Sequence, residues 1–76
     1  MKELVQFIAQ QLVNNPGAVE VKEIHGETDT VLELRVAKED LGRVIGKQGR
    51  TAKSIRTIVN AVAARKNLKV TLEIVE

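Results

Sequence analysis

Cysteine is absent from this 76-residue chain, and histidine occurs only once, as His25. The absence of cysteine excludes disulfides and cysteine-ligated zinc or iron–sulfur sites, and a lone histidine excludes a multi-histidine metal site. We therefore expect neither a metal nor a cofactor. Long apolar runs are also missing, because no stretch approaches the roughly 20 apolar residues that a membrane-spanning helix needs. Residues Met1–Leu4 include an acidic residue and begin no signal-peptide core, so we expect a cytoplasmic protein without membrane insertion.

The residue types that usually carry catalysis are scarce as well. There is no cysteine nucleophile and no obvious Ser–His grouping, and His25 lies in a predicted polar turn, where a solvated histidine is the usual case. Residues Gly42–Gln48 faintly resemble a phosphate-binding loop, but that loop needs four residues between its glycines and a Ser or Thr after the lysine. Here three residues separate the glycines, and a glutamine follows the lysine. The sequence therefore predicts that this protein is not an enzyme.

Acidic residues are missing from one long stretch of the chain. The formal net charge is only +2, but residues 43–66 hold seven basic residues and no acidic one, while the rest of the chain holds all ten acidic residues. Such asymmetry in a small domain favours a surface that faces a polyanion; the alternative is a solvated helix with chance clustering of charge. The basic residues of this block are Arg43, Lys47, Arg50, Lys53, Arg56, Arg65 and Lys66.

The pattern of apolar residues predicts one α+β domain over residues 1–76, without a linker or an internal repeat. Apolar residues recur at helical spacing in three segments and alternate with polar residues in three others. The predicted helices cover residues 3–14, 38–45 and 50–66, and the predicted strands cover residues 18–24, 30–37 and 68–74. The first two strands should form a hairpin. The order αββααβ predicts a three-stranded sheet packed on one face by three helices.

The same spacing predicts which side chains these elements bury. The first helix should turn Leu4, Ile8 and Leu12 to one side, and Asn67 should end the last helix. The last helix carries its apolar residues on one arc and its polar residues on a neighbouring arc. The apolar arc comprises Ala52, Ile55, Ile58, Val59, Val62 and Ala63, and the polar arc comprises Arg50, Lys53, Arg56, Thr57 and Asn60.

Two glycines, Gly46 and Gly49, lie between the second predicted helix and the third. Glycine accepts a positive φ and leaves its amide uncovered, so the backbone of another chain can approach closely. The helix that begins after this turn aims free N–H groups at the same place, which favours an anion. Because the surrounding side chains are basic, a phosphate backbone is the expected anion.

The run Val44-Ile45-Gly46-Lys47-Gln48-Gly49-Arg50, set between two helices in the order αββααβ, resembles the type II KH domain. The resemblance covers essentially the whole chain, and a free-standing domain of this size is similar to the small bacterial RNA-binding proteins of the KhpA family. It implies that the Gly46–Gly49 loop clamps single-stranded RNA over about four nucleotides. One departure is Ala52, where KH domains often carry a large aliphatic residue; Ile55 then supplies the next apolar anchor.

The resemblance also implies a role for each residue near the loop. Close approach is assigned to Gly46 and Gly49, the exposed tip to Lys47 and Gln48, phosphate pairing to Arg50 and Lys53, and outer contacts to Arg43 and Arg56. Bases would lie in a groove between the helices that flank the loop and the second strand, lined by Val44, Ile45 and positions near Leu34. Since Phe7 is the only aromatic residue, aromatic stacking is unavailable in that groove.

One such groove selects sequence poorly, because a four-base sequence recurs by chance every ~256 bases. We therefore expect weak, salt-sensitive and broadly tolerant binding, with a second KH surface needed for useful specificity. The resemblance implies a homodimer, or pairing with a larger KH protein of the KhpB (Jag-like) type. It also implies a post-transcriptional or RNA-chaperone role linked to cell-envelope growth, cell shape or division. The contact face stays open between the broad apolar surface around Phe7 and the small residues Ala61 and Ala64.

Two other functions are compatible with the same residues. The chain could be a protein-interaction or assembly module that keeps a KH fold, because a fold alone does not fix a function. The basic residues retained around the loop argue against that reading. Single-stranded DNA is the other alternative ligand, since no residue is required to read a 2′-hydroxyl, and RNA is favoured by the resemblance alone.

Overall fold

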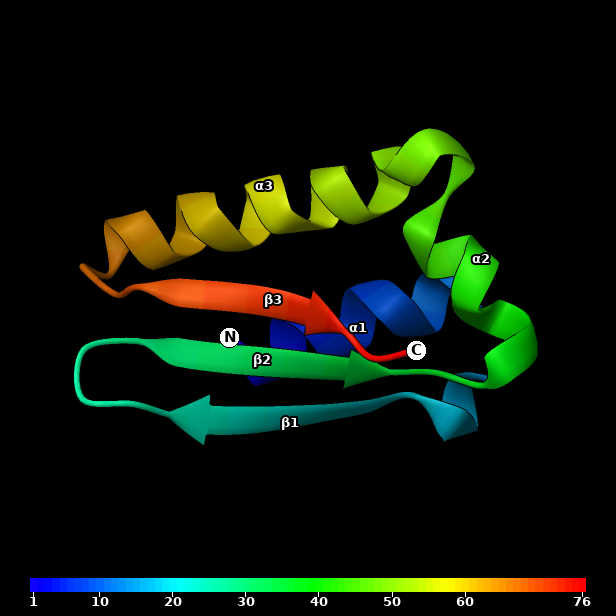
Figure 1. Cartoon of the computed structure of the whole chain (residues 1–76), viewed down its shortest axis with the longest axis horizontal. Coiled ribbons are helices and arrows are strands. Elements are labelled where there is room, and N and C mark those ends of the chain that lie inside the picture. The colour runs from blue at the N-terminus through cyan, green and yellow to red at the C-terminus, as the bar shows by residue number, and fades with distance from the viewer.

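The computed structural model describes all of residues 1–76, and its secondary structure follows the predicted order αββααβ (Figure 1). Strands β1 and β2 form an antiparallel hairpin, as predicted, and β3 pairs with β2 in parallel. The elements are α1 (Lys2–Leu12), β1 (Glu20–His25), β2 (Thr30–Arg35), α2 (Leu41–Ile45), α3 (Arg50–Arg65) and β3 (Val70–Ile74), with 3₁₀ turns η1 (Pro16–Ala18), η2 (Lys38–Asp40) and η3 (Lys47–Gly49). The α+β fold class is therefore confirmed.

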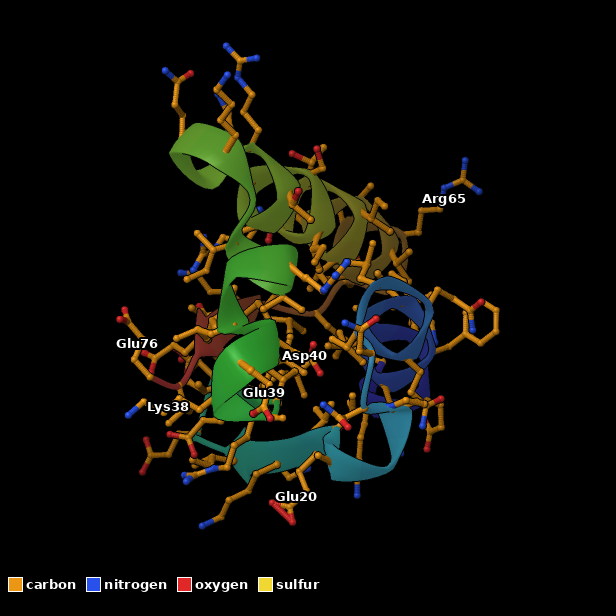
Figure 2. All side chains as sticks on the ribbon, turned by 90° about the vertical axis from the view of Figure 1, so that its right-hand side faces the viewer. Glu20, Lys38, Glu39, Asp40, Arg65 and Glu76 are labelled. Carbon is orange, nitrogen blue, oxygen red and sulfur yellow. The ribbon has the colours of Figure 1, made fainter.

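The core lies between the sheet and the helices. Side chains alternate across each strand, so that Val21, Leu32 and Leu72 are buried on the helix side while their neighbours in sequence face outward. Val5 of α1 and Val59 of α3 belong to the same cluster and pack against it from the helix side. The helices lie to one side of the sheet, and its other face is open (Figures 1 and 2). This layering places the turn between α2 and α3 at one end of the molecule (Figure 1).

Helix α1 buries a different stripe from the predicted one. Its fully buried residues are Val5 and Ala9, whereas Leu4, Ile8 and Leu12 are only half-buried. A small residue such as Ala9 lets the helix approach its neighbours closely, and the larger side chains then pack at the margin of the contact. Phe7 points away from this stripe and is 60% exposed.

Helix α3 confirms most of its predicted apolar arc. Ala52, Ile55, Val59 and Ala63 are buried, but Ile58 is 44% exposed because α3 covers the edge of the sheet and buries only a narrow stripe. The helix ends as predicted: Asn67 adopts a φ of 55°, and the Leu68 N–H donates to the Ala63 carbonyl at 2.8 Å. This is a Schellman ending, which takes up the residues between α3 and β3. The last strand therefore begins at residue 70 instead of 68.

The short predicted helix over residues 38–45 is divided in two. Its first three residues form the 3₁₀ turn η2, and the α-helix begins only at Leu41. None of the helices is both long and apolar enough to span a lipid bilayer. No group of three or more His, Cys, Asp or Glu side chains is placed to hold a metal ion.

Candidate nucleic-acid interface

The turn between α2 and α3 has a backbone conformation that needs glycine at two positions. Gly46 has a φ of 78° and Gly49 has a φ of 74°. The Gly49 N–H donates to the Gly46 carbonyl at 3.1 Å and closes the turn. Between them, Gln48 also has a positive φ of 57°, which costs a non-glycine residue on the order of 1 kcal/mol. The tip of the turn is thus held in a conformation that projects Lys47 and Gln48 from the surface.

Gly46 is also required by packing. A Cβ atom at this position would overlap the side chain of Thr51 and lie 2.8 Å from the Thr51 amide nitrogen. The Gly46 N–H donates to the Gly42 carbonyl at 2.8 Å, so the residue also ends α2. Gly49, by contrast, has open space where a Cβ would be placed. The first glycine therefore packs the turn against α3, and the second leaves the backbone accessible.

Helix α3 begins directly after the turn with no side chain capping its N-terminus. The Gly49 and Arg50 amides donate to the Gly46 and Lys47 carbonyls within η3, and the macrodipole makes this end of the helix positive. Three nearby side chains, those of Lys47, Arg50 and Lys53, add to the same sign of charge. Those of Lys47, Gln48, Arg50 and Lys53 are exposed and take part in no ion pair or side-chain hydrogen bond within the protein.

Arg43 and Arg56 differ from these four residues because their side chains already contact other groups of the protein. The Arg43 Nε lies 3.8 Å from Asp40 Oδ1, and the side chain of Arg43 is 54% exposed. The Arg56 Nε–H donates to the Leu72 carbonyl at 3.2 Å. In the β2–β3 pair the carbonyl of residue 69 and the amide of residue 75 face β2, so alternation leaves the Leu72 carbonyl on the free edge of the sheet. Arg56 thus covers part of that edge.

One of the predicted groove residues is not on the surface. Val44 is fully buried in the main core cluster, so its side chain does not line the surface. Leu34 is buried as well, but the positions next to it, Arg35 and Val36, line a surface hollow. Val44 packs inward from α2, while Ile45, the next residue, is half-buried and packs at the margin of the core. The predicted anchor Ile55 is buried in the core, and Ala52 is buried as well. The buried side chains of Val44, Ala52 and Ile55 therefore support the turn from the core.

A surface hollow of about 640 Å³ lies at the opposite end of α2 from the turn. Apolar side chains of Val36, Leu41 and Val75 form its floor together with charged residues at its rim. Its lining residues are Arg35, Val36, Lys38, Leu41, Val75 and Glu76. Arg35 and Val36 are strand positions next to Leu34, where a groove was predicted, but Leu41 and Val75 were not predicted to line one. Leu41 could have been found from its spacing of three and four residues from Val44 and Ile45, but Val75 joins the hollow only through the pairing of β3 with β2.

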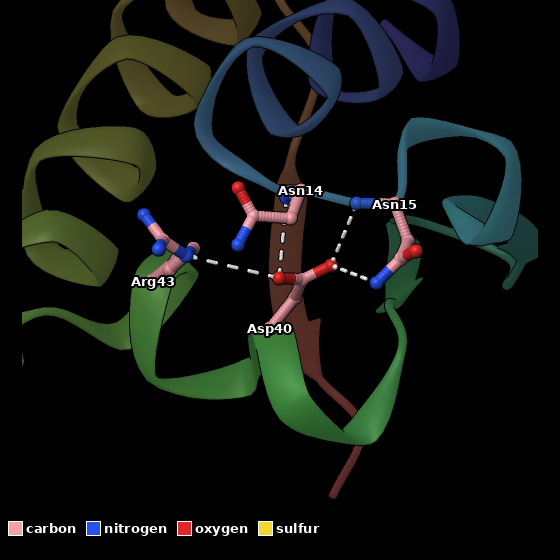
Figure 3. A network of polar contacts seen from close by, with 4 residues as sticks. All are labelled: Asn14, Asn15, Asp40 and Arg43. Atoms are coloured by element: carbon pink, nitrogen blue, oxygen red, sulfur yellow. Dashed lines mark hydrogen bonds and ion pairs between the residues drawn. The ribbon is translucent and has the colours of Figure 1, made fainter.

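Asp40 is the one buried charged residue, and its role was not predicted from the sequence. Its Oδ1 accepts the Asn14 N–H at 3.2 Å, and its Oδ2 accepts the Asn15 N–H at 3.0 Å and the Asn15 Nδ2–H at 3.2 Å (Figure 3). Burial acts to raise the pKa of Asp40, but these hydrogen bonds and the charge of Arg43 outweigh it, so the pKa lies below its ordinary value of 3.8. Asp40 is therefore a buried carboxylate held in its charged form.

The basic block of the sequence is divided in space. Arg65 projects from the far end of α3 (Figure 2), and Lys66 follows it, so these two residues lie a helix length away from the turn. The other five basic residues lie on or next to α2, the turn and the first half of α3. The structure thus gathers Arg43, Lys47, Arg50, Lys53 and Arg56 at one end and leaves two basic residues apart.

Known proteins are similar to this chain over almost its whole length. The family described as KhpA/KhpB, KH domain, matches residues 2–74 of the chain. RNA-binding protein KhpA of Caldanaerobacter subterraneus subsp. tengcongensis and that of Clostridium perfringens are each 56% identical over 75 residues, which is 99% of this chain and 100% of theirs. RNA-binding protein KhpA of Chlamydia trachomatis is 50% identical over 76 residues, which is 100% of this chain and 97% of the relative. No solved structure gives a significant match.

Proposed function

Because the chain belongs to the KhpA/KhpB family of KH domains, we propose that it binds single-stranded RNA and that its Gly46–Gly49 turn grips the RNA backbone. Membership of this family confirms the resemblance drawn from the sequence. It also agrees with the expectation that the protein is not an enzyme, since the relatives are named for RNA binding. The relatives match over nearly their whole length, so the proposal concerns the chain as a single unit.

The observation that carries the proposal is the group of free charges at the turn. Lys47, Arg50 and Lys53 have no acidic partner within 4.0 Å, and they surround a helix N-terminus that no side chain caps. An unpaired cation gains by neutralising a phosphate and releasing its counterion, whereas a cation already in an ion pair gains less. A Gly49 backbone with open space around it lets a sugar–phosphate chain approach.

We place the bases along α2, between the turn and the hollow at the other end of that helix. The hollow offers apolar contact from Val36, Leu41 and Val75, with Lys38 and Arg35 at its rim. Aliphatic contact, backbone hydrogen bonds and charge would then hold the bases, which aromatic stacking holds in other RNA-binding folds. Binding of this kind is tolerant of sequence, and for single strands its logarithmic salt slope is about −0.7 per phosphate neutralised.

The biological role that fits such a domain is that of a post-transcriptional regulator or RNA chaperone in the cytoplasm. Tolerant binding by one domain becomes more useful when two KH surfaces act together, because linkage raises the effective concentration of the second site. We therefore propose that the protein acts as a homodimer or with a KH protein of the KhpB type. The exposed apolar side chains of Phe7 and Ile58 are the candidate contacts. Sedimentation of Phe7→Gln and Ile58→Gln variants tests this: the variant that interrupts the interface should sediment as a monomer.

The test of RNA binding is fluorescence anisotropy with a labelled single-stranded RNA over a salt series. Lys47→Asp/Gln48→Asp reverses the charge at the tip and should weaken binding by at least about tenfold, which is 1.4 kcal/mol. The matched control is Lys69→Asp/Thr28→Asp, which changes the net charge equally at two exposed positions beyond the opposite end of the sheet. Circular dichroism verifies that both variants fold.

Each outcome has a distinct meaning. Loss of affinity in the tip variant alone supports the clamp. Equal loss in both variants would mean that only net charge matters and would contradict the clamp. If the wild-type protein binds no RNA, the chain is better read as an assembly module with a KH fold. A parallel series with DNA of the same sequence tests the remaining alternative, a protein for single-stranded DNA.

A further inference from the structure

The carboxylate of Asp40 makes hydrogen bonds that are unusual for a residue at the start of a helix. Asp40 occupies the N-cap position of α2, where an aspartate side chain ordinarily accepts a hydrogen bond from the first turn of its own helix. Here it makes no such bond. Both of its oxygens instead accept hydrogen bonds from Asn14 and Asn15, which lie 26 and 25 residues earlier in the chain. The residue therefore joins two segments that are distant in sequence.

These two segments are the connection that follows α1 and the start of α2. Figure 2 shows the neighbours Lys38 and Glu39 at the surface, while Asp40 turns into the molecule. Asp40 is 1% exposed, and a buried carboxylate is tolerated only when hydrogen bonds and charges compensate for its lost hydration. The Asn14 and Asn15 amides and the Arg43 guanidinium supply that compensation (Figure 3). The start of α2 is thus fixed to the connection that follows α1.

We propose that Asp40 is a positioning residue for RNA binding, which fixes the direction of α2 and so the placement of the Gly46–Gly49 turn at its other end. The proposal rests on the proposed function. Helix α2 has only five residues, about 7.5 Å at 1.5 Å per residue, so a change of tilt at its start moves the turn directly. The same carboxylate also holds the side chain of Arg43, which lies on α2, in an ion pair at 3.8 Å.

The charge of Asp40 and its positioning role predict opposite effects of Asp40→Asn on RNA affinity. Asp40→Asn removes a negative charge near a surface that we expect to face phosphates, and it frees Arg43. By charge alone, RNA affinity should rise. By position, affinity should fall, because the asparagine NH₂ would face the backbone donors that the carboxylate accepts, and the start of α2 would shift. The direction of the change therefore separates the two explanations.

The matched control is Glu39→Gln, which removes the same charge from the adjacent exposed residue and makes no hydrogen bond or ion pair in this structure. At a temperature where all variants are folded, we expect Asp40→Asn to weaken RNA binding by roughly threefold to tenfold. Glu39→Gln should bind as tightly as wild type or slightly more tightly. In the free proteins, the Gly46 and Gly49 amide signals in ¹⁵N–¹H spectra should move in Asp40→Asn and stay in place in Glu39→Gln.

Unchanged or tighter binding by a folded Asp40→Asn, with unmoved glycine signals, would overturn the positioning role and leave the RNA clamp intact. If wild type itself fails to bind RNA, the proposed function fails, and the glycine signals alone then decide whether Asp40 positions the turn. If Asp40→Asn does not fold, Asn15→Ala takes its place. It removes only the 3.2 Å side-chain contact to Asp40 Oδ2, and the proposal requires that it shift the same two signals and weaken binding less than tenfold but measurably.

Discussion

The open face of the sheet and the turn between α2 and α3 both carry charged side chains, but they arrange them in opposite ways. On the sheet, Glu20 is opposite Arg35 and Lys22 is opposite Glu33 in the β1–β2 register, and these four residues share one shallow hollow. Figure 2 shows Glu20 pointing away from the helices. Around the turn, Lys47, Arg50 and Lys53 have no acidic neighbour. Alternating signs cancel on the first surface, and the second keeps its positive field.

This contrast between the two surfaces indicates where a polyanion should bind. A surface whose charges cancel offers little attraction beyond a Debye length of about 8 Å at physiological salt. A surface with one sign of charge attracts a phosphate backbone over that range and then gains from counterion release. Composition alone does not distinguish the two surfaces, because the chain as a whole carries only +2. The register of the strands and the geometry of the turn make the distinction.

The largest expected effect comes from breaking the backbone of the turn while leaving its charges in place. Gly46→Ala combines a positive φ with overlap against Thr51, and we expect it to lower the free energy of unfolding by at least about 3 kcal/mol. Gly49→Ala meets open space and should lose only about 1–2 kcal/mol from strain. Thermal unfolding measures both. Equal losses would mean that Gly46 does not pack the turn against α3.

A smaller effect is expected when one charge is removed from each surface in turn. Arg50→Gln takes a free cation from the turn and should make the logarithmic salt slope of RNA binding less negative by about 0.7. Lys22→Gln takes a cation whose register partner is Glu33 and should leave the slope unchanged. Anisotropy titrations at several salt concentrations give both slopes. An equal change of slope in the two variants would remove the distinction between the surfaces.

The buried charge of Asp40 predicts a dependence of stability on pH. A pKa lowered in the folded protein means that the contribution of Asp40 is fully present above the ordinary pKa of 3.8 and is lost as the pH falls through the folded-state pKa. The difference in Tm between wild type and Asp40→Asn should therefore be constant from about pH 8 to 5 and shrink below about pH 4. Circular dichroism melts across this range test it. A difference that grows toward acid pH would have the wrong sign.

The smallest expected effect concerns Arg56, whose side chain is hydrogen-bonded to the edge of β3. Arg56→Gln removes the hydrogen bond to the Leu72 carbonyl and should cost about 1 kcal/mol of stability. Lys53→Gln, on the same helix, has no side-chain contact to lose and should leave stability within about 0.5 kcal/mol of wild type. Chemical denaturation resolves the two. A loss of stability in Lys53→Gln that matched the loss in Arg56→Gln would show that the bond to Leu72 contributes nothing.

The sequence alone predicted the elements and the turn because both depend on local rules. Apolar spacing located every helix and strand to within a few residues, and the two glycines marked the turn. The assignments that went wrong depend on tertiary contacts. Helix α2 is too short for periodicity to show that Val44 is buried while Ile45 is only half-buried. The roles of Asp40 and Arg56 could not be predicted, because their partners, Asn14, Asn15 and Leu72, come from other elements.

The most direct test of RNA binding at the turn is to map the RNA onto the folded protein residue by residue. A ¹⁵N-labelled sample is titrated with a short single-stranded RNA, and the amide signals of the turn and of the open sheet face are followed together. A clamp at the turn predicts that the signals of Gly46, Gly49 and Lys53 move with RNA while those of Lys22 and Glu33 stay in place. Movement centred on Lys22 and Glu33, with an unmoved turn, would contradict it.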